Sequence, residues 1–488
     1  MQGESLLHFT ETKVISRAGS LKRDGSCGLR TQEEESKTSK EGVLKLIGLI
    51  AAVTLLSESA SGATIQTDGS SRSVQSAISK AQPGDTVLIP NGTYHWASQV
   101  TVNKFVHLQG ASIGGVTLID DISSGGVMVV VNSSPAGNTS ISNLVIIPGA
   151  VNGASNQSYG LGVYAGGQPV LLHDCTFYTT QSNPYNYDVQ WGMNGGVIWN
   201  CTFDSLGNYI AGIEFQQQND TDWKNPSTVG TLDTNGVRNT YVEDCTFKTA
   251  YISCSDMGDD ARVVYRHCTF FNSTLYCHGQ DTSPWGARQW EVYNNTFTWT
   301  GSGSGSKTVN GHTYSWTYPL NQQCWFSVRG GTGVFWGNAI DSILWKHEVI
   351  QLNVFSINRA SNDIPCQTQY PAARQVGQGW IGAGGYAYAN ASIDGTGYTT
   401  DPICVWGNTG SGVASGEAVV GLNQYAPDDC GNGQLIENYV QQGRDYLFSA
   451  KANYTPYPYP HPLRSGSRIA TSAPKQPGRL RRPPHSIR

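Results

Sequence analysis

A short phrase that recurs along the chain constrains the fold more than any other feature of this sequence. The copies end in Thr-Phe after a polar corner, and they read LLHDCTF (171–177), VIWNCTF (197–203), YVEDCTF (241–247), VYRHCTF (264–270) and VYNNTF (292–297). Degraded copies are VFWGNAI (334–340) and CVWGN (404–408). The corner residues are spaced 26, 44, 23 and 27 residues apart, and they are Cys175, Cys201, Cys245, Cys268 and Asn295. Intervals of about 20–30 residues, lengthened by loop insertions, are typical of a β-solenoid.

Each position of the phrase has a physical role in such a solenoid. Strand side chains alternate between faces, so the apolar residue three before the corner and the Phe two after it point inward. The polar pair between them makes the bend, because Asn tolerates the left-handed conformation. Rungs stacked about 4.8 Å apart then satisfy one another's backbone and bury one core. The phrase predicts an all-β chain of stacked parallel rungs with one file of rings, namely Phe177, Phe203, Phe247, Phe270 and Phe297.

The corner cysteines are expected to be structural. Asn295 stands where the other copies have Cys, so the position requires a small side chain rather than a thiol. Cys254 and Cys277 are 23 residues apart, which places them in register on neighbouring rungs where they could bridge. The better disulfide candidates lie in the irregular C-terminal part, and they are Cys366, Cys404 and Cys430.

An apolar run near the N-terminus indicates export. Residues 43–56 (VLKLIGLIAAVTLL) are flanked by lysines upstream and small residues downstream, and the run is too short to span a membrane. We therefore assign residues 1–63 to an N-terminal extension with a signal peptide. The mature protein is expected to be secreted or held at the cell surface, with no membrane segment.

The remaining chain divides into three parts. We expect a parallel β-helix over 64–355, C-terminal rungs and capping loops over 356–463, and a disordered basic tail over 464–488. Ser73–Ala81 predicts a short helix that caps the first rung, because an open solenoid edge needs cover. The proline-rich ending at 454–463 (YTPYPYPHPL) cannot extend a sheet and is expected to seal the last rung.

Charge is uneven along the chain and excludes nucleic acid as a partner. The chain has 31 basic and 36 acidic residues, and residues 1–63 with 464–488 hold 15 of the basic and eight of the acidic ones. Residues 64–463 therefore keep 16 basic and 28 acidic residues, a net charge of −12. Nucleic acid phosphates need a basic surface. An anionic polysaccharide would likewise need a local basic patch or a bridging cation.

The phrase PGDTVLIPNGTY (83–94), followed by rungs of the N-C-T-F type, resembles the pectin-lyase-like right-handed parallel β-helix superfamily. The resemblance covers roughly residues 65–410. Segments that resemble a group of secreted bacterial β-helix proteins are GARQWEVYNNTF (286–297), ARQVGQG (373–379), VWGN (405–408) and the YPYPHP ending. The resemblance implies a single-stranded right-handed solenoid that holds a polysaccharide. Superfamily members include polysaccharide lyases, glycoside hydrolases, epimerases and phage tailspikes, so the fold does not fix the reaction.

One stretch is also similar to the chondroitinase B and alginate lyase family. It is YRHCTFFNSTLYCHG (265–279), and the family pattern there is Y-R-x-N-x-F…L-x-L-R-H-G. This sequence departs from the pattern at the reacting groups. Cys277 stands where the family has its catalytic arginine, and the family's lysine falls near Asp259. The family's own mechanism therefore does not carry over.

Side-chain alternation places ionisable groups on the outer face, where superfamily members generally hold their active site. The strands that precede the phrases carry inward pairs, which are Ile213/Phe215, Ile252/Cys254, Leu275/Cys277 and Phe326/Val328. The outward column between them reads Glu214, Ser253/Ser255, Tyr276/His278 and Ser327/Arg329. On successive rungs, His278 and Arg329 are expected about 5 Å apart, and Glu214 about 10 Å from His278. Turns between strands are expected to hold Asp256, Asp259, Asp260 and Asp281.

Two reactions can use these groups. In β-elimination a base removes the proton α to a uronate carboxyl while a cation neutralises that carboxyl, and His278 or Tyr276 serves as base with Arg329 as the cation. In hydrolysis two carboxyl groups flank the bond, and the pair is Glu214 with Asp256 or Asp281. We expect cleavage of an acidic polysaccharide by β-elimination, with a glycoside hydrolase as the alternative. The competing hypothesis is a non-catalytic β-helix that binds glycan or spaces other modules.

Aromatic and basic side chains supply the expected sugar contacts. Ten of the 13 Trp lie between Trp191 and Trp345, and a narrow solenoid interior favours smaller side chains, so several Trp are expected outside. The substrate-binding candidates are Trp199, Arg266, Trp285, Arg288, Trp325 and Trp336. No cofactor is required, although the closely spaced carboxylates of DMGDD offer a Ca²⁺ site at Asp256, Asp259 and Asp260.

Overall fold

The structure of the chain, a computed structural model, covers one solenoid and its caps. It describes residues 62–465 except for 150–158, 165–166, 181–185, 194, 209, 217–225, 232, 234, 251, 280–285, 302, 310, 319–323, 343–347, 361–365, 369, 373, 381–397, 412–419 and 425–427. The expected signal segment, Asp281 and Trp285 therefore lie outside the described residues. Within the described part, no helix is long and apolar enough to cross a membrane.

Three long sheets, all of them parallel, make up the wall of the solenoid. Sheet A has 12 strands, in the order β1 (Thr64–Gln66), β2 (Thr86–Ile89), β5 (His107–Gly110), β8 (Ser140–Ser142), β11 (Leu171–His173), β14 (Val197–Trp199), β17 (Thr240–Glu243), β20 (Arg262–Arg266), β23 (Gln289–Tyr293), β28 (Thr332–Trp336), β33 (Ile403–Trp406) and β35 (Tyr446–Leu447). Sheet B has nine strands, in the order β3 (Gly92–Trp96), β6 (Val116–Asp120), β9 (Leu144–Pro148), β12 (Thr176–Tyr178), β15 (Thr202–Asp204), β18 (Thr246–Lys248), β21 (Thr269–Phe271), β24 (Thr296–Trp299) and β29 (Ala339–Ser342).

Sheet C carries the outward column that the sequence analysis singled out. Its ten strands are β4 (Val100–Val102), β7 (Val127–Asn132), β10 (Tyr159–Tyr164), β13 (Val189–Gly192), β16 (Ile210–Phe215), β19 (Ser253–Met257), β22 (Leu275–Cys277), β27 (Phe326–Val328), β30 (Ile350–Leu352) and β34 (Val420–Leu422). Outside the wall lie two antiparallel hairpins, β25 (Gly303–Val309) with β26 (His312–Tyr318), and β31 (Gln378–Trp380) with β32 (Tyr398–Thr400). The helices are α2 (Ser71–Lys80), α3 (Ile436–Tyr439) and the 3-10 turns Phe355–Ile357 and Pro462–Ser465.

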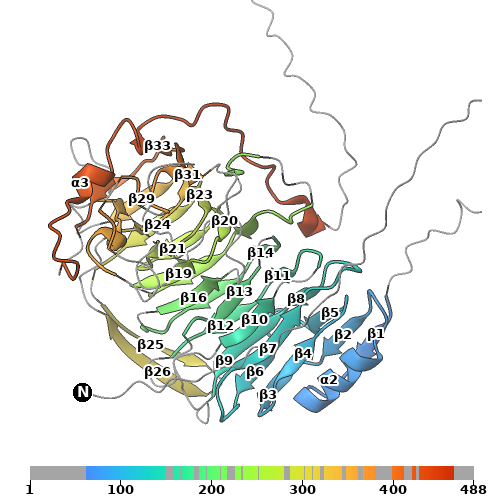
Figure 1. Ribbon diagram of the computed structural model, residues 1–488. Coiled ribbons are helices and arrows are strands. Elements are labelled where there is room, and N and C mark those ends of the chain that lie inside the picture. The colour runs from blue at the N-terminus through green and yellow to red at the C-terminus, as the bar shows by residue number, and fades with distance from the viewer. Residues whose placement is uncertain are drawn as a thin grey trace, which may run out of the picture. The chain divides into compact units, whose positions relative to one another are not determined.

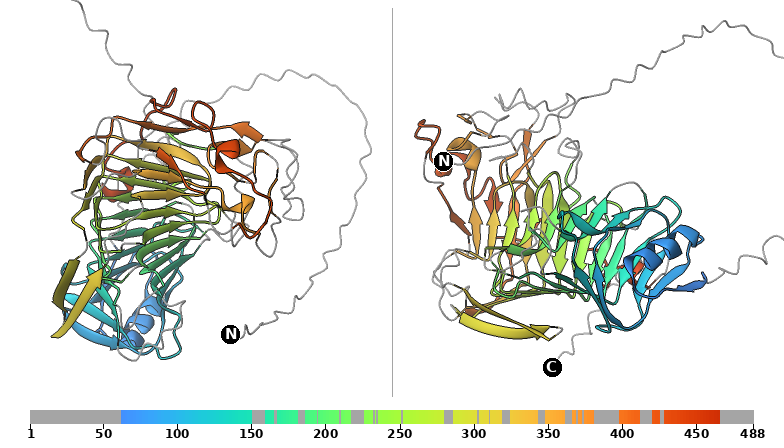
Figure 2. Two further views of the ribbon diagram at one scale, coloured as in Figure 1. Left: turned by 90° about the vertical axis from the view of Figure 1, so that its left-hand side faces the viewer. Right: turned by 90° about the horizontal axis from the view of Figure 1, so that it is seen from below.

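From β2 to β30 the chain visits the sheets in the fixed cycle A, B, C before it returns to A one rung further on. Strands β11, β12 and β13 form one such rung, and β14, β15 and β16 form the next. Figure 1 shows the strands of each sheet stacked in this way, and Figure 2 shows the ladder from two further sides. The predicted right-handed parallel β-helix is confirmed.

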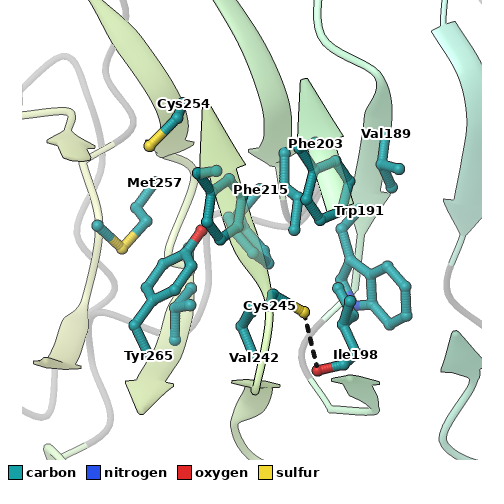
Figure 3. Close-up of a cluster of buried hydrophobic side chains, with 14 of the residues drawn as sticks. Val189, Trp191, Ile198, Phe203, Phe215, Val242, Cys245, Cys254, Met257 and Tyr265 are labelled. Atoms are coloured by element: carbon teal, nitrogen blue, oxygen red, sulfur yellow. Dashed lines mark hydrogen bonds between the residues drawn. The ribbon is translucent and has the colours of Figure 1, made fainter. Parts of the chain in front are cut away.

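The predicted file of Phe rings is present in the core. Neighbouring rings from Phe177 to Phe297 stack nearly parallel, with centroid distances of 5.1, 4.9, 5.1 and 4.6 Å. The strand register pairs Phe203 with Phe247 and Phe247 with Phe270. Phe203, Trp191 and Phe215 belong to the same buried cluster (Figure 3), in which Phe215 packs edge-on against Tyr265 at a centroid distance of 6.2 Å. The recurring phrase therefore runs from sheet A through the corner into sheet B.

The corner between sheets A and B uses two residues in a fixed way. The first takes the left-handed conformation in every copy, with φ between 51° and 55° at Asp174, Asn200, Asp244, His267 and Asn294. The second turns its side chain inward to a carbonyl of the preceding rung, as Cys245 Sγ does to the oxygen of Ile198 at 3.8 Å (Figure 3). At the later rungs amides replace thiols, and Asn295 Nδ2 donates to Asn338 Oδ1 at 3.1 Å. The corner cysteines are buried free thiols.

Cysteine pairing follows the prediction only in the C-terminal part. Cys366 and Cys430 form a disulfide, whereas Cys404 is a free thiol. The bridge suggested for Cys254 and Cys277 is wrong, because both are free. The strand register places Met257 opposite Cys277, so Cys254 lies three residues away from the bridging position.

The core is wider than the sequence analysis assumed. Five Trp side chains are at most 1% exposed, although a narrow interior was expected to favour smaller side chains, and they are Trp96, Trp191, Trp290, Trp299 and Trp325. Trp290 packs edge-on against Phe326, and Trp325 packs edge-on against Phe297. These indoles fill the space between the three sheets, where a continuous core excludes water.

The first rung is capped as predicted. Helix α2 starts after Ser70, whose side chain accepts a hydrogen bond from the backbone N–H of Ser73, and it buries Val74, Ala77 and Ile78 over the core. The Gln75 amide also pairs with the edge strand β4, because it donates to the carbonyl of Thr101 at 3.1 Å and accepts from its N–H at 2.7 Å. The helix thus satisfies the backbone N–H and C=O groups of this edge strand, which could otherwise pair with a strand of another molecule.

The proline-rich ending lies elsewhere than predicted. Residues 453–465, here called the strap, do not seal the last rung but run back over the outward face of sheet A, where the red segment ends in Figure 1. Tyr454 OH donates to Glu291 Oε2 at 2.7 Å, and Arg266 donates to the carbonyl of Pro458 at 2.9 Å. Prolines lack the N–H that would extend a sheet, yet their carbonyls still accept hydrogen bonds. Arg464, assigned to the disordered tail, belongs to this ordered segment.

Candidate functional site

The outward column of sheet C brings a carboxylate pair together. Strand pairing places Glu214 beside Asp256 and Asp256 beside Tyr276. Ser255 was expected at this position and Asp256 in a turn, and both expectations are wrong. Ser255 points into the core, where Tyr265 OH donates to its hydroxyl at 2.7 Å. Asp256 is therefore the residue on the rung between Glu214 and Tyr276.

A bulge in β16 causes this register. Two residues of β16, Ala211 and Gly212, stand opposite one residue of β19, because Ile210 pairs with Ser253 and Ile213 with Ser255. Gly212 has φ +86°, and a Cβ there would lie 2.1 Å from the carbonyl oxygen of Cys254. Glycine alone fits this turn of the backbone.

Asp188 holds the bulge in place. Its carboxylate accepts from the N–H of Gly212 at 2.7 Å and from the hydroxyl of Thr179 at 2.6 Å, and the residue is fully buried. Burial raises the pKa of Asp188 to about 7. The two hydrogen bonds oppose that rise because they stabilise the ionised form. Asp188 is thus the positioning residue behind Glu214.

Glu214 is a nearly buried acid with two donors. It is 6% exposed, and its carboxyl accepts from Tyr159 OH at 2.5 Å and from Gln216 Nε2 at 2.6 Å. Burial raises the pKa of Glu214 to about 7, and the neighbouring Asp256 carboxylate adds to the rise. A carboxyl group with this pKa still holds its proton at near-neutral pH and can deliver it to a leaving group.

Asp256 and His278 form a hydrogen-bonded pair next to that acid. The distance from His278 Nδ1 to Asp256 Oδ1 is 2.5 Å, and the side chains are 27% and 14% exposed. This contact engages Nδ1, which leaves Nε2 of the imidazole on the other side of the ring to exchange a proton. Asp256 therefore orients the histidine in the way a carboxylate orients a general base.

Arg329 lies one rung beyond His278, as predicted, but it is not presented to solvent. The pairing of Cys277 with Val328 makes His278 and Arg329 neighbours. The guanidinium is 4.5 Å from the ring centre of Tyr276 and 4.6 Å from that of Phe355, and Arg329 is 4% exposed. Burial raises the pKa of Tyr276, while the arginine opposes that rise. The two residues stack at the margin of the carboxylate pair.

Two further acids stand in the turn after β19, as predicted. Asp259 and Asp260 both have positive φ, of 44° and 62°. Burial, followed by the charges of Asp260 and Asp256, raises the pKa of Asp259 to about 8. Arg374 Nη1 lies 3.8 Å from Asp260, and both of these side chains are buried. Among the described residues, no three His, Cys, Asp or Glu side chains are close enough to hold a metal ion, so the Ca²⁺ site stays a prediction.

The predicted sugar-binding residues on sheet A form a column, but the strap covers it. Trp199, Arg266 and Trp336 belong to this column through the register of β14 to β28. Trp199 is 7% exposed beneath Arg464, and Trp336 donates its indole N–H to Tyr454 OH at 3.2 Å. Arg266, a predicted substrate contact, is instead fully buried and paired with Glu243. Their expected exposure is therefore wrong for Trp199 and Arg266.

Two other binding candidates are also buried. Arg288 and Trp325 are each 1% exposed, so neither can contact a sugar chain from outside the wall. The residues that sequence reasoning missed are Tyr159, Gln216 and Asp188, together with the place of Asp256. The sequence did contain a signal for the position of Asp256, because Gly212 interrupts an apolar strand and such a glycine often marks a bulge.

The chain was compared with known proteins. No protein-family profile matches the sequence, and no curated protein matches it at a significant level. An alginate lyase from Paenibacillus sp. str. FPU-7 is 13% identical, with a TM-score of 0.40 over 74% of this chain and 99% of that chain. A mannuronic acid specific polysaccharide family 6 lyase from human gut microbiota is 12% identical, with a TM-score of 0.37 over 83% and 93%.

Pectin methylesterase PemA from Erwinia chrysanthemi is 13% identical, with a TM-score of 0.30 over 73% of this chain and 92% of that chain. Similarity at this level concerns the fold alone. The sheet order described above assigns that fold independently, since three parallel sheets are visited in a constant cycle from β2 to β30. The chain has the right-handed parallel β-helix fold.

Proposed function

We propose that this protein is a carbohydrate-active enzyme that hydrolyses a glycosidic bond at the Glu214–Asp256 pair. One observation carries the proposal: two carboxyl groups stand side by side on neighbouring rungs, one with a pKa of about 7 and the other bound to His278. Acid catalysis on one side of a bond and base catalysis on the other need such a pair.

Each residue has a distinct role in this reaction. Glu214 donates its proton to the glycosidic oxygen as the bond breaks. The Asp256–His278 pair accepts the proton of the attacking water, with the imidazole Nε2 as the accepting atom. Tyr159 and Gln216 fix the Glu214 carboxyl through hydrogen bonds to its two oxygens, so that the proton is offered in one direction. After the reaction Glu214 has lost a proton and His278 has gained one, and exchange of protons with water restores both groups.

Hydrolysis fits the site better than the β-elimination expected from the sequence. Elimination needs a cation or acid against the uronate carboxyl, and the arginine expected to supply it is packed between Tyr276 and Phe355. The carboxyl groups of Glu214 and Asp256, by contrast, face each other on neighbouring rungs. The geometry therefore favours the paired-carboxylate reaction.

We further propose that the enzyme acts outside the cytoplasm. The apolar segment at 43–56 supports export, and the Cys366–Cys430 disulfide is of the kind that persists in oxidising compartments.

Two product assays on one polysaccharide panel test the reaction. Reducing-sugar release reports any chain cleavage, and absorbance of the unsaturated uronate product reports elimination only. The purified chain is expected to release reducing ends without that absorbance. Glu214→Gln and Asp256→Asn are each expected to lower the rate by about 10²–10⁴-fold, because each removes one proton-transfer group.

Gln109→Ala serves as the matched control, since this half-buried side chain lies on the outer face of sheet A, away from the site. Its rate should equal that of the unchanged chain. Reducing ends that appear together with the unsaturated product would show that elimination is the reaction, and a full rate in Glu214→Gln would remove that residue from the mechanism.

A further inference from the structure

We propose that the outward face of sheet C binds an uncharged glycan chain along the solenoid axis, with its subsites on the rungs before Glu214. This inference rests on the proposed function, because it names the substrate class of the same site. Residues Tyr164, Gln190 and Gln216, here called the amide track, lie half-buried on strands β10 and β13 and directly after β16.

The amide track is a continuous hydrogen-bond chain that ends on the catalytic acid. Tyr164 OH donates to Gln190 Oε1 at 2.7 Å, and Gln190 Nε2 donates to Gln216 Oε1 at 3.1 Å. Gln216 Nε2 then donates to Glu214 Oε1 at 2.6 Å. Each amide nitrogen carries two N–H donors and this chain uses one of them. The second N–H and the remaining oxygen lone pair suit the hydroxyl groups of a sugar, which both accept and donate.

Two glycines let the ring of Tyr164 lie flat on the sheet. A Cβ at Gly162 would come within 2.7 Å of the tyrosine oxygen, and a Cβ at Gly192 within 3.0 Å of the ring. Gly162 belongs to the same strand, and Gly192 pairs with Tyr164 on the next rung. The ring therefore rests with one face on the backbone and turns its other face outward. A flat aromatic face of this kind is a stacking surface for the apolar face of a pyranose.

The outward positions around the track offer a uronate little accessible positive charge. From β10 to β30, the outward positions that the structure describes carry one guanidinium, that of Arg329, and its two flanking rings leave it 4% exposed. Four carboxyl groups, by contrast, gather within the next two rungs and the turn beside them, and they are Glu214, Asp256, Asp259 and Asp260. A polymer with one carboxylate per sugar needs a cation for each bound unit. The amide track offers neutral amide groups on rungs about 4.8 Å apart, and such groups bind sugar hydroxyls rather than carboxylates.

Binding measured without turnover tests the inference. Glu214→Gln, which keeps the carboxyl geometry but cannot react, is titrated calorimetrically with neutral polysaccharides (glucans, xylan, mannan, galactan) and with polygalacturonate and alginate. We expect a neutral glycan to bind and the uronate polymers to bind at least tenfold more weakly. Adding Gln190→Ala should raise the Kd about three- to tenfold, the loss of one or two hydrogen bonds.

Two further variants separate the stacking surface from the hydrogen bonds. Tyr164→Leu should weaken binding more than Tyr164→Phe, because phenylalanine keeps the flat ring, and Gln109→Ala on sheet A should change nothing. Uronate binding as tight as neutral binding, or an unchanged Kd in Gln190→Ala, overturns the inference, as does the lack of binding to every neutral glycan. Gln190-dependent binding of a neutral glycan by a chain that cleaves nothing would keep the substrate class and reject the proposed hydrolysis.

Discussion

Asp188 illustrates how a single buried side chain sets the geometry of a site it does not enter. Both of its carboxylate oxygens accept a hydrogen bond, one from Thr179 and one from Gly212. The second bond fixes the bulge that places Glu214 beside Asp256. The residue precedes strand β13, and nothing in its local sequence distinguishes it from an ordinary turn aspartate.

Replacing Asp188 by Asn should therefore damage both stability and rate. The amide offers one acceptor where two donors converge, so one buried donor loses its partner at a cost of about 1–3 kcal/mol in unfolding free energy. The misplaced bulge should lower kcat more than it raises KM, since Tyr164 and Gln190 of the amide track lie on β10 and β13, outside the bulged strand. Urea denaturation and steady-state kinetics measure the two effects.

Asp174→Asn is the matched control for that experiment. It changes a corner residue with φ +55°, and Asn200 and Asn294 occupy the equivalent corners with φ of 51° and 55°. The control should stay within about 0.5 kcal/mol of the unchanged chain. Equal effects of the two substitutions would contradict the role given to Asp188.

At the scale of elements, the strap covers the outward face of sheet A and buries the side chains on it. Arg266 bonds Glu243, Tyr293 and the backbone of the strap, and it is fully buried. His461 of the strap is buried beside two arginines, and burial followed by their charge lowers its pKa to about 3. The histidine is thus neutral in this contact. The outward column of sheet A is therefore covered by the strap.

Arg266→Ala should loosen the strap and destabilise the chain. Glu243 is fully buried and would lose its closest cationic partner, which costs about 3–5 kcal/mol for a buried pair. We expect a lower thermal midpoint and faster proteolysis near residues 453–465. Arg72→Ala on the surface of α2 is the comparison, with an expected change of about 0.5 kcal/mol or less. Arg266→Ala with an unchanged midpoint would mean that the strap is not held by this network.

At the scale of the whole molecule, stability comes from files of alike side chains that run from rung to rung. Phe247 contacts Phe203 and Phe270 at 4.9 and 5.1 Å and is fully buried. Phe247→Ala should therefore cost about 3–5 kcal/mol. Phe271→Ala, on the half-buried outer face of the next strand, should cost much less. Chemical denaturation of both variants checks this, and similar losses would argue against a file as the main source of stability.

Features of the fold that follow the periodic pattern could be predicted from the sequence, whereas features that depend on a single long-range contact could not. Spacing and alternation located the Phe file, the corners, the cap helix and the neighbours His278 and Arg329, because each depends on a periodic pattern. The bulge at Gly212 escaped because its tether, Asp188, is 24 residues away. The burial of Trp199 escaped because its cover, Arg464, follows 265 residues later. Single long-range contacts of this kind leave no period in the chain.

The central claim is that Glu214 delivers a proton, and the pH dependence of kcat/KM on a cleaved glycan tests it most directly. The protonated form is the active one, so the rate should fall as the pH rises through about 7, the pKa that burial gives this carboxyl. A melting curve at each pH confirms that the chain stays folded. A kcat/KM that is level or rising between about pH 6 and 8.5 would contradict the account.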